Sequence, residues 1–334
     1  MLQSFLVKPF HFEYKQMHTP EPGEGEVLIR LTQVGVCGSD LRLFKNGPDL
    51  GESMTIGHEG IGFIERVGAN INSERVGERV VIEPNIPCME CRECKKGMVS
   101  VCRNKRIIGV KETGCFAEYI VLPSPFAHRL PDNISDQDAV AIEPTTVGLA
   151  ALKRSKSKPG DTIAVLGLGA IGMLLTHVAL KMGYKVLVTE INPEKVEKAV
   201  QMGAVRLKAR DEHELEDSWD DANVVSVFEC AGTAKTATHT IAAAPRGAEI
   251  VLLGLSSQNA EFNPLLLSRK GNTILPSLIY DHPVHFQECI DMVSRGIIQP
   301  GLIVSKYFPL NELESALTEA TKGIENKIVI RIPE

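Results

Sequence analysis

The sequence predicts an α/β protein with one β-rich domain and a second domain built on a doubly wound parallel sheet. Short Val/Ile-rich runs interrupted by glycine fill the first third of the chain, at 27–37, 60–68 and 78–84, which is typical of a barrel-like antiparallel sheet. From about residue 145, near-continuous apolar strands alternate with amphipathic helices, as in parallel sheets covered on both faces. With 334 residues the chain is long enough for two cores.

The elements after residue 145 can be placed from these patterns. Strands are expected at 162–167, 185–190, 204–209, 224–232, 249–255 and 272–280. Helices are expected between them, for example at 171–183 and 193–203. The C-terminal part is expected to form helices at 282–296 and 311–323 and a last short strand at 327–332.

Composition excludes several kinds of partner. The formal net charge of −6 gives no electrostatic reason to expect nucleic acid or an anionic membrane. No apolar run is long enough to predict a transmembrane helix. The N-terminus, MLQSFLVKPFHFEYKQ, lacks the pattern of a secretory signal, so we expect a cytoplasmic protein.

A glycine motif, GLGAIG at 167–172, lies between an expected strand and an expected helix. That context predicts a Rossmann dinucleotide site. Gly167 would allow the tight turn, Gly169 would let a pyrophosphate approach the backbone, and Gly172 would let helix and strand pack closely. The helix that begins at Ala170 and Ile171 would offer unpaired N–H groups to the phosphates.

A carboxylate, Glu190, ends the next expected strand. It can accept hydrogen bonds from the adenosine ribose hydroxyls and would repel a 2′-phosphate. The next residue is the apolar Ile191, where a basic residue would favour NADP, and Lys195 and Lys198 lie further along. The pattern favours NAD over NADP.

Four cysteines lie in one short polar stretch, PCMECRECKKGMVSVC: Cys88, Cys91, Cys94 and Cys102. Their spacing lets one loop turn four thiolates onto a tetrahedral Zn²⁺, and disulfide pairing is the alternative. Disulfides are rare in a reducing compartment, which favours the metal.

Three further fragments carry metal-ligating side chains. GVCGSD contains Cys37, GHEG contains His58 and Glu59, and AIEP contains Glu143. Each fragment alone is usually structural. Together with GCFAEY, GLGAIG and the four-cysteine loop, in this order and spacing, they resemble the zinc-containing medium-chain alcohol dehydrogenase family. Glu143 in an Ile-Glu-Pro context is similar to the branch of sorbitol, galactitol-phosphate, threonine and sugar-acid dehydrogenases.

The resemblance implies a zinc-binding GroES-like catalytic domain formed by 1–146 and 282–334, and an NAD-binding Rossmann domain at 147–281. It implies two Zn²⁺ per subunit. Catalytic zinc would be held by Cys37 and His58, with Glu59 and Glu143 completing or exchanging in the remaining positions. Structural zinc would be held by the four-cysteine loop, which leaves no position open for substrate.

Other residues near the catalytic metal also receive roles from the resemblance. Asp40 would orient His58, and Ser39 would relay the proton of the substrate hydroxyl. Several relatives carry a histidine where this chain has Arg42, and a guanidinium cannot serve as general base at neutral pH. The proton would leave through Ser39, water and a carboxylate or ribose hydroxyl.

The predicted function is NAD-linked oxidation of a secondary alcohol on a polyol, sugar or sugar acid. A phosphorylated polyol or L-threonine is the alternative substrate. A zinc hydrolase or a non-catalytic NAD-binding protein fits the motifs less well. The family implies a homodimer or homotetramer. The remaining histidines have no motif partner and are interpreted as structural: His11, His18, His128, His177, His213, His239, His282 and His285.

Overall fold

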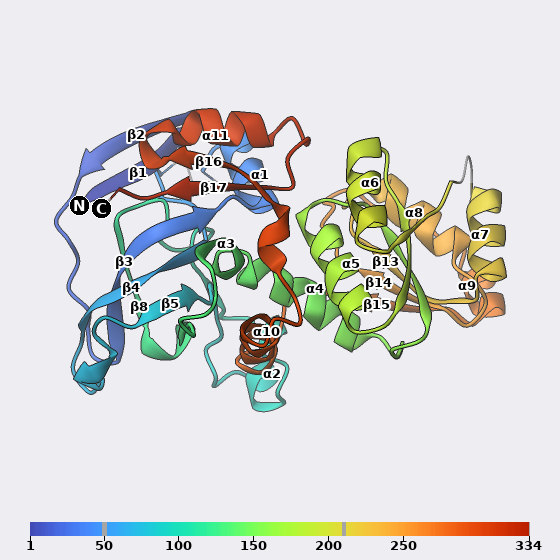
Figure 1. The fold of residues 1–334 in the computed structure, drawn as a ribbon, viewed down its shortest axis with the longest axis horizontal. Coiled ribbons are helices and arrows are strands. Elements are labelled where there is room, and N and C mark those ends of the chain that lie inside the picture. The colour runs from blue at the N-terminus through green and yellow to red at the C-terminus, as the bar shows by residue number, and fades with distance from the viewer. Residues whose placement is uncertain (49–51, 209–211, 334) are drawn as a thin grey trace. The chain divides into compact units, whose positions relative to one another are not determined.

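The computed structural model describes residues 1–48, 52–208 and 212–333 (Figure 1). The chain divides into two compact units, Met1–Glu143 with His282–Glu334, and Pro144–Asp281. In the part that is described, no helix is both long and apolar enough to span a bilayer.

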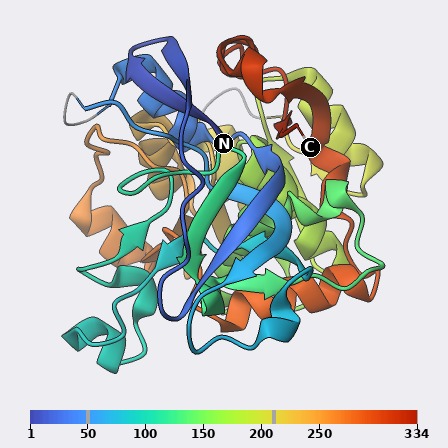
Figure 2. The same cartoon turned by 90° about the vertical axis from the view of Figure 1, so that its left-hand side faces the viewer.

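The first unit is built on a seven-stranded, mainly antiparallel sheet in the order β16-β17-β3-β4-β5-β9, with β8 also paired to β3 (Figure 2). A separate hairpin, β1-β2, and the short pair β6-β7 complete its strands. The bounds are β1 Leu2–Lys8, β2 His11–Gln16, β3 Glu26–Gly35, β4 Glu59–Val67, β5 Arg79–Ile82, β6 Asn85–Ile86, β7 Arg106–Ile107, β8 Tyr119–Pro123, β9 Ala127–Arg129, β16 Val304–Pro309 and β17 Lys327–Arg331.

Short helices accompany this sheet: α1 Gly38–Asn46, α2 Arg92–Lys95, α3 Asp136–Ala139, α10 Val284–Ser294 and α11 Leu313–Ala320. The core combines alternate residues of the strands, such as Val27, Ile29 and Leu31 of β3, with Leu313 and Leu317 of α11. Alternation places these strand side chains on one face, which explains why a single face of β3 enters the core. The expected β-rich domain is confirmed.

The second unit holds a six-stranded parallel sheet in the order β12-β11-β10-β13-β14-β15. Its bounds are β10 Thr162–Leu166, β11 Lys185–Thr189, β12 Val205–Arg206, β13 Val224–Glu229, β14 Glu249–Leu252 and β15 Thr273–Pro276. The order reverses between β10 and β13, and in such sheets ligands bind beside that point. All six expected strands are present, although β12 is shorter than predicted and Ala209 lies outside the described residues.

Helices cover this sheet, with α5 and α6 packing on β10, β11 and β12, and α7 and α8 packing on β13 and β14 (Figure 1). The bounds are α4 Ile142–Arg154, α5 Ala170–Lys181, α6 Pro193–Gln201, α7 Glu212–Asp221, α8 Ala234–Ala243 and α9 Pro264–Lys270. The strands β10, β11, β13 and β14 are mostly buried because helices cover the sheet, whereas β12 is exposed and β15 is exposed or half-buried. The predicted doubly wound fold is confirmed.

Candidate functional site

Cys37, His58 and Glu59 are brought together by one pair of strands. β3 and β4 are antiparallel, with Gly35 opposite Glu59. The chain leaves β3 into Cys37 and enters β4 from His58, so the two residues lie at the same end of the pair. One ligand atom from each of the three side chains lies within 4.8 Å of the others.

Asp40 organises the backbone around this group. Cys37 caps the N-terminus of α1, and its N–H donates to Asp40 Oδ2 at 2.8 Å. The N–H of Gly57 donates to Asp40 Oδ1 at 3.1 Å. Since Asp40 is fully buried, these bonds fix the loop before β4 against the start of α1.

The same carboxylate lies next to His58. Asp40 Oδ1 is 3.6 Å from His58 Nδ1, just beyond hydrogen-bond distance. Burial lowers the pKa of His58, but the negative charge of Asp40, with that of Cys37, outweighs burial and raises the pKa well above its ordinary value. When a histidine binds a metal through one ring nitrogen, its other ring nitrogen is commonly oriented by a carboxylate such as that of Asp40.

Ser39 and Arg42 both lie on α1. The Oγ atom of Ser39 is buried and has no hydrogen-bond partner within the described ranges. A buried hydroxyl without a partner is costly, and a bound hydroxyl would satisfy it. Arg42 is exposed.

Lys327, on β17, is a residue of this site that sequence reasoning missed. Its Nζ atom lies 2.7 and 2.6 Å from the two carboxylate oxygens of Glu59, and it donates to the carbonyl of Val36 at 3.0 Å. Both side chains are buried. Burial lowers the pKa of Lys327, but Glu59 raises it above the ordinary value, and Cys37 and Glu143 act in the same direction.

Gly35 makes room for this pair. A Cβ atom at Gly35 would collide with Oε2 of Glu59, one of the two oxygens that contact Lys327. In the sequence, Lys327 appears only as the first residue of an apolar run, KIVIRI. A lysine in such a position is normally exposed, so nothing in the pattern indicates its role.

Glu143 lies in the first turn of α4 and is buried. It is close enough to Lys327 to raise the pKa of that amine, but it is not part of the compact group of Cys37, His58 and Glu59.

A thiol, an imidazole and a carboxylate suit Zn²⁺, whose catalytic sites use three protein ligands and leave one position open. The residues present therefore fit a catalytic zinc.

The four cysteines of the loop form a second compact group: Cys88, Cys91, Cys94 and Cys102. Cys102 Sγ is 3.5 Å from Cys88 Sγ and 3.9 Å from Cys91 Sγ. Tetrahedral Zn–S bonds of about 2.3 Å place sulfur atoms about 3.8 Å apart, so the spacing fits the metal. All eight cysteines are free thiols, which removes the disulfide alternative.

Two of these thiols have shifted pKa values. The N–H groups of Glu90 and Cys91 lower the pKa of Cys88 to about 7. Burial raises the pKa of Cys94 to about 12, so this thiol ionises only against a cation. A coordinating metal deprotonates such a thiol outright.

Replacing Cys94 by serine should remove one zinc per chain and lower stability. Structural zinc contributes directly to folding. A loss of about 2 kcal/mol would lower the melting temperature by roughly 5 °C for a protein of this size class. Metal analysis and thermal unfolding check this, with the exposed Met98→Ser of the same loop as control. Unchanged zinc content would contradict the assignment.

A groove of about 780 Å³ opens in the second unit beside the glycine motif, and Gly167, Gly169 and Glu190 line it. Gly167 has a φ of +89°, and a Cβ there would meet the backbone nitrogen of Ala231 at 2.7 Å. A Cβ on Gly169 would instead point into open space, which leaves room for a ligand close to the backbone.

The helix α5 begins at Ala170, so Ala170, Ile171 and Gly172 present the N–H groups of its first turn, which have no intrahelical acceptor. A Cβ on Gly172 would collide with the carbonyl of Gly167. The turn therefore has the close packing that the motif predicts. A pyrophosphate fits this cradle.

Glu190 is held at the edge of the groove. Its Oε2 accepts from the N–H of Leu168 at 2.6 Å, and its Oε1 accepts from those of Ile191 and Asn192 at 2.8 and 3.0 Å. Oε1 thus already accepts two hydrogen bonds, and the remaining acceptor capacity lies on Oε2.

Three basic side chains also line the groove: Lys195, which the sequence raised, and Arg206 and Lys208, which it did not. Lys198, which the sequence also raised, is not among its lining residues.

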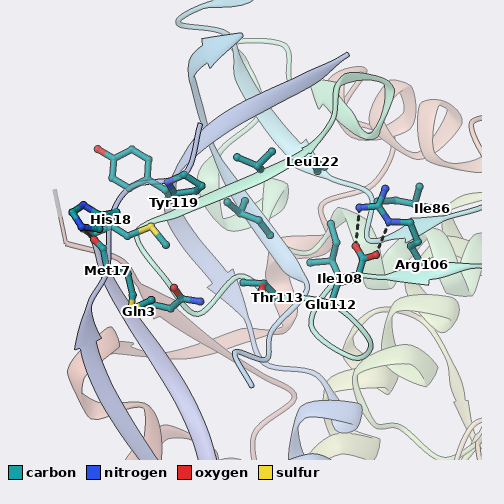
Figure 3. A pocket seen from close by; sticks show the side chains of 14 residues that line it. Gln3, Met17, His18, Ile86, Arg106, Ile108, Glu112, Thr113, Tyr119 and Leu122 are labelled. Atoms are coloured by element: carbon teal, nitrogen blue, oxygen red, sulfur yellow. Dashed lines mark hydrogen bonds and ion pairs between the residues drawn. The ribbon is translucent and has the colours of Figure 1, made fainter. Parts of the chain in front are cut away.

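A smaller pocket of about 350 Å³ lies in the first unit (Figure 3). Its floor is apolar, with Ile86, Ile108 and Leu122, and the ion pair of Arg106 and Glu112 lies at one side. None of the predicted site residues lines it. We therefore do not assign the chemistry to this pocket.

Comparison with known proteins finds family models for both parts of the chain. A model of the alcohol dehydrogenase GroES-like domain matches residues 23–132, and a zinc-binding dehydrogenase model matches residues 170–295. Sorbitol dehydrogenase of Bacillus subtilis (strain 168) is 30% identical over 312 residues, covering 90% of this chain and 88% of that protein.

Solved structures show the same fold. A short chain alcohol dehydrogenase from Escherichia coli CFT073, complexed with cofactor NADH, matches with a TM-score of 0.92, 28% identity and 99% of both chains covered. Galactitol-1-phosphate dehydrogenase from Escherichia coli matches with a TM-score of 0.91 and 26% identity, covering 99% of this chain and 100% of that one. The chain therefore belongs to the zinc-type medium-chain alcohol dehydrogenase family and is an oxidoreductase of that family.

Proposed function

We propose that the protein interconverts a secondary alcohol and a ketone on a polyol, sugar or sugar acid, using Zn²⁺ and NAD(H). The observation that supports this most strongly is the compact group of half-buried Cys37 with buried His58 and Glu59, in a chain that also carries the glycine-motif groove. A zinc hydrolase would need no such groove. A non-catalytic relative would have no need for the metal ligands.

Each residue of the group then has a task. When bound, Zn²⁺ acts as a Lewis acid toward the substrate oxygen and lowers the pKa of the hydroxyl. Cys37 and His58 would hold the metal, and Glu59 and Glu143 would complete or exchange in its remaining positions. Asp40 keeps His58 and the Cys37 backbone in place.

Ser39 carries the proton. Its buried Oγ atom has no partner among the described residues, so it can accept a hydrogen bond from the substrate hydroxyl and donate its own proton onward. When bound, NAD⁺ would be the oxidant that takes the hydride of the carbinol carbon, and the hydroxyl proton would leave through Ser39. The products are a ketone, NADH and a proton.

The cofactor site is assigned to the turn at Gly167, Gly169, Ala170, Ile171 and Gly172, with Glu190 accepting from the ribose hydroxyls. The relative solved with NADH supports this choice. We accordingly assign the catalytic role to residues 1–146 with 282–334, and the NAD-binding role to 147–281. That the protein forms a homodimer or homotetramer is still a prediction. So is its location in the cytoplasm, where zinc-binding thiols remain reduced.

The substrate class rests on Glu143 and on relatives that include sorbitol and galactitol-1-phosphate dehydrogenases. Initial rates of NAD reduction across polyols, sugar acids, polyol phosphates, L-threonine and simple alcohols test it. We expect polyols or sugar acids to give the highest kcat/KM. Preference for a polyol phosphate or L-threonine would select the alternative substrate, which an L-threonine 3-dehydrogenase relative keeps open. Turnover of simple alcohols alone would contradict the polyol assignment.

Replacing Glu190 by serine should weaken the use of NAD as coenzyme and favour the use of NADP. A hydrogen bond to a charged group contributes about 1.5–3 kcal/mol, so kcat/KM for NAD should fall about 10- to 100-fold. The value for NADP should rise because Lys195, Arg206 and Lys208 line the same groove and attract a phosphate.

Steady-state kinetics with both coenzymes measure the change. Glu194→Ser is the matched control, since Glu194 is an exposed carboxylate in the next helix. An unchanged ratio of the two kcat/KM values would show that Glu190 does not select the coenzyme.

A further inference from the structure

A third group of potential metal ligands lies in the first unit, away from the residues assigned above. It consists of Glu83, His128 and His282, whose ligand atoms lie within 4.8 Å of one another. His128 belongs to β9, Glu83 directly follows β5, and His282 begins the C-terminal segment of the unit. Pairing of β5 with β9 places Glu83 beside His128 although 45 positions separate them.

Contacts on all sides hold the two imidazole rings. Phe126 stacks on His282 with a centroid distance of 4.4 Å, and Phe286 stacks on His128 at 4.7 Å. Gln287 contacts Nδ1 of His128 at 2.6 Å. Metal-binding histidines usually have their second ring nitrogen fixed by such a polar group, which orients the ring before the metal arrives.

The carboxylate between the rings is only partly satisfied. Oε2 of Glu83 lies 2.6 Å from Nε2 of His128 and 2.7 Å from Nδ1 of His282. Oε1 is buried and has no partner in the ranges that the structure describes. Glu83 is fully buried, and within those ranges no lysine or arginine forms an ion pair with it.

A buried carboxylate without a strong cation partner is unfavourable, and a divalent cation would supply the missing charge and a ligand for Oε1. Two imidazoles and one carboxylate are ligands that Zn²⁺ and related transition metals accept. The side chain of His282 is 14% exposed, so the group is not wholly closed off from solvent.

We propose that Glu83, His128 and His282 form a third metal site, which binds a divalent transition metal such as Zn²⁺ in addition to the two zincs of the family. Neutral histidines can bind it without net loss of protons. The proton on Nε2 of His128 moves to Nδ1, and the Gln287 amide, whose nitrogen faces Nδ1 in this structure, turns over so that its oxygen accepts that proton; the proton on Nδ1 of His282 moves to Nε2. The distances of 2.6 and 2.7 Å describe the hydrogen-bonded, metal-free form.

Zinc content per chain tests the site directly. The purified protein is incubated with a small excess of Zn²⁺, separated from free metal by gel filtration and analysed for zinc. The variant His282→Asn keeps an amide N–H close to the position of Nδ1, so it can still donate to Glu83 but is a poor ligand. Glu83→Gln serves as a second variant, and the exposed His213→Asn, on α7, is the matched control.

We expect the wild type and His213→Asn to retain one zinc more per chain than His282→Asn and Glu83→Gln. Added Zn²⁺ should also raise the melting temperature of the first two proteins more than that of the others, because a ligand of the folded state stabilises it. The turnover of the three variants should stay within a few-fold of the wild-type value.

Equal zinc content in all four proteins would overturn the proposal. So would a lower melting temperature of His282→Asn without any loss of zinc, since this identifies a hydrogen-bonded cluster alone. If one variant does not fold, the other decides by its zinc count.

Discussion

Replacing Cys37 by serine should reduce turnover by at least about a thousandfold and remove one zinc per chain. A Lewis-acid metal stabilises the developing charge by several kcal/mol, and each 1.36 kcal/mol is a factor of about ten in rate. Serine lacks the thiolate that Zn²⁺ binds, and the Cys37 thiol lies within 4.8 Å of the ligand atoms of His58 and Glu59. Measured kcat and zinc content per chain check the prediction.

Cys94→Ser is the matched control because it also loses a thiol and a zinc, but from the loop that has no open position. We expect its stability to fall more than that of Cys37→Ser, and its kcat to fall much less. Retained turnover in Cys37→Ser, with an unchanged zinc content, would show that Cys37 is not a ligand.

Replacing Lys327 by methionine should lower the free energy of unfolding by about 3–5 kcal/mol, because Glu59 would be left buried without its cation. Both oxygens of Glu59 contact Nζ of Lys327, and both side chains are shielded from water. Methionine keeps most of the aliphatic length, so the loss reports on the charge rather than on packing. Urea unfolding measures it.

The double variant Lys327→Met with Glu59→Gln separates the ion pair from the fold. It should be more stable than Lys327→Met, since the uncompensated charge is gone, and a double-mutant cycle with the single Glu59→Gln gives the coupling. If Lys327→Met alone is as stable as the wild type, the pair does not support this part of the structure.

The sequence predicts well what depends on neighbours along the chain. The glycine turn is recognisable because Gly167, Gly169 and Gly172 act within one strand–helix junction. The four-cysteine loop is recognisable for the same reason, since its ligands lie within 15 consecutive residues. The parallel sheet follows from apolar strands that alternate with helices, so its fold class could be predicted without contacts.

What the sequence could not show depends on pairing between distant strands. Lys327 meets Glu59 across 268 positions because β17 pairs with β3 and β3 pairs with β4. His282 meets Glu83 across 199 positions, and no spacing rule connects them. Histidines interpreted as structural one by one become a candidate metal site only when the strands of the barrel are assembled.

The absence of a side chain at Gly35 has a consequence for how this protein can change. Any larger residue there would push the Glu59 carboxylate out of its place, and Lys327 would lose the partner that makes its burial tolerable. The position thus couples three residues on three strands, β3, β4 and β17, and a change at one demands changes at the others. Single substitutions at any of these three positions should therefore be poorly tolerated, whatever substrate the protein takes.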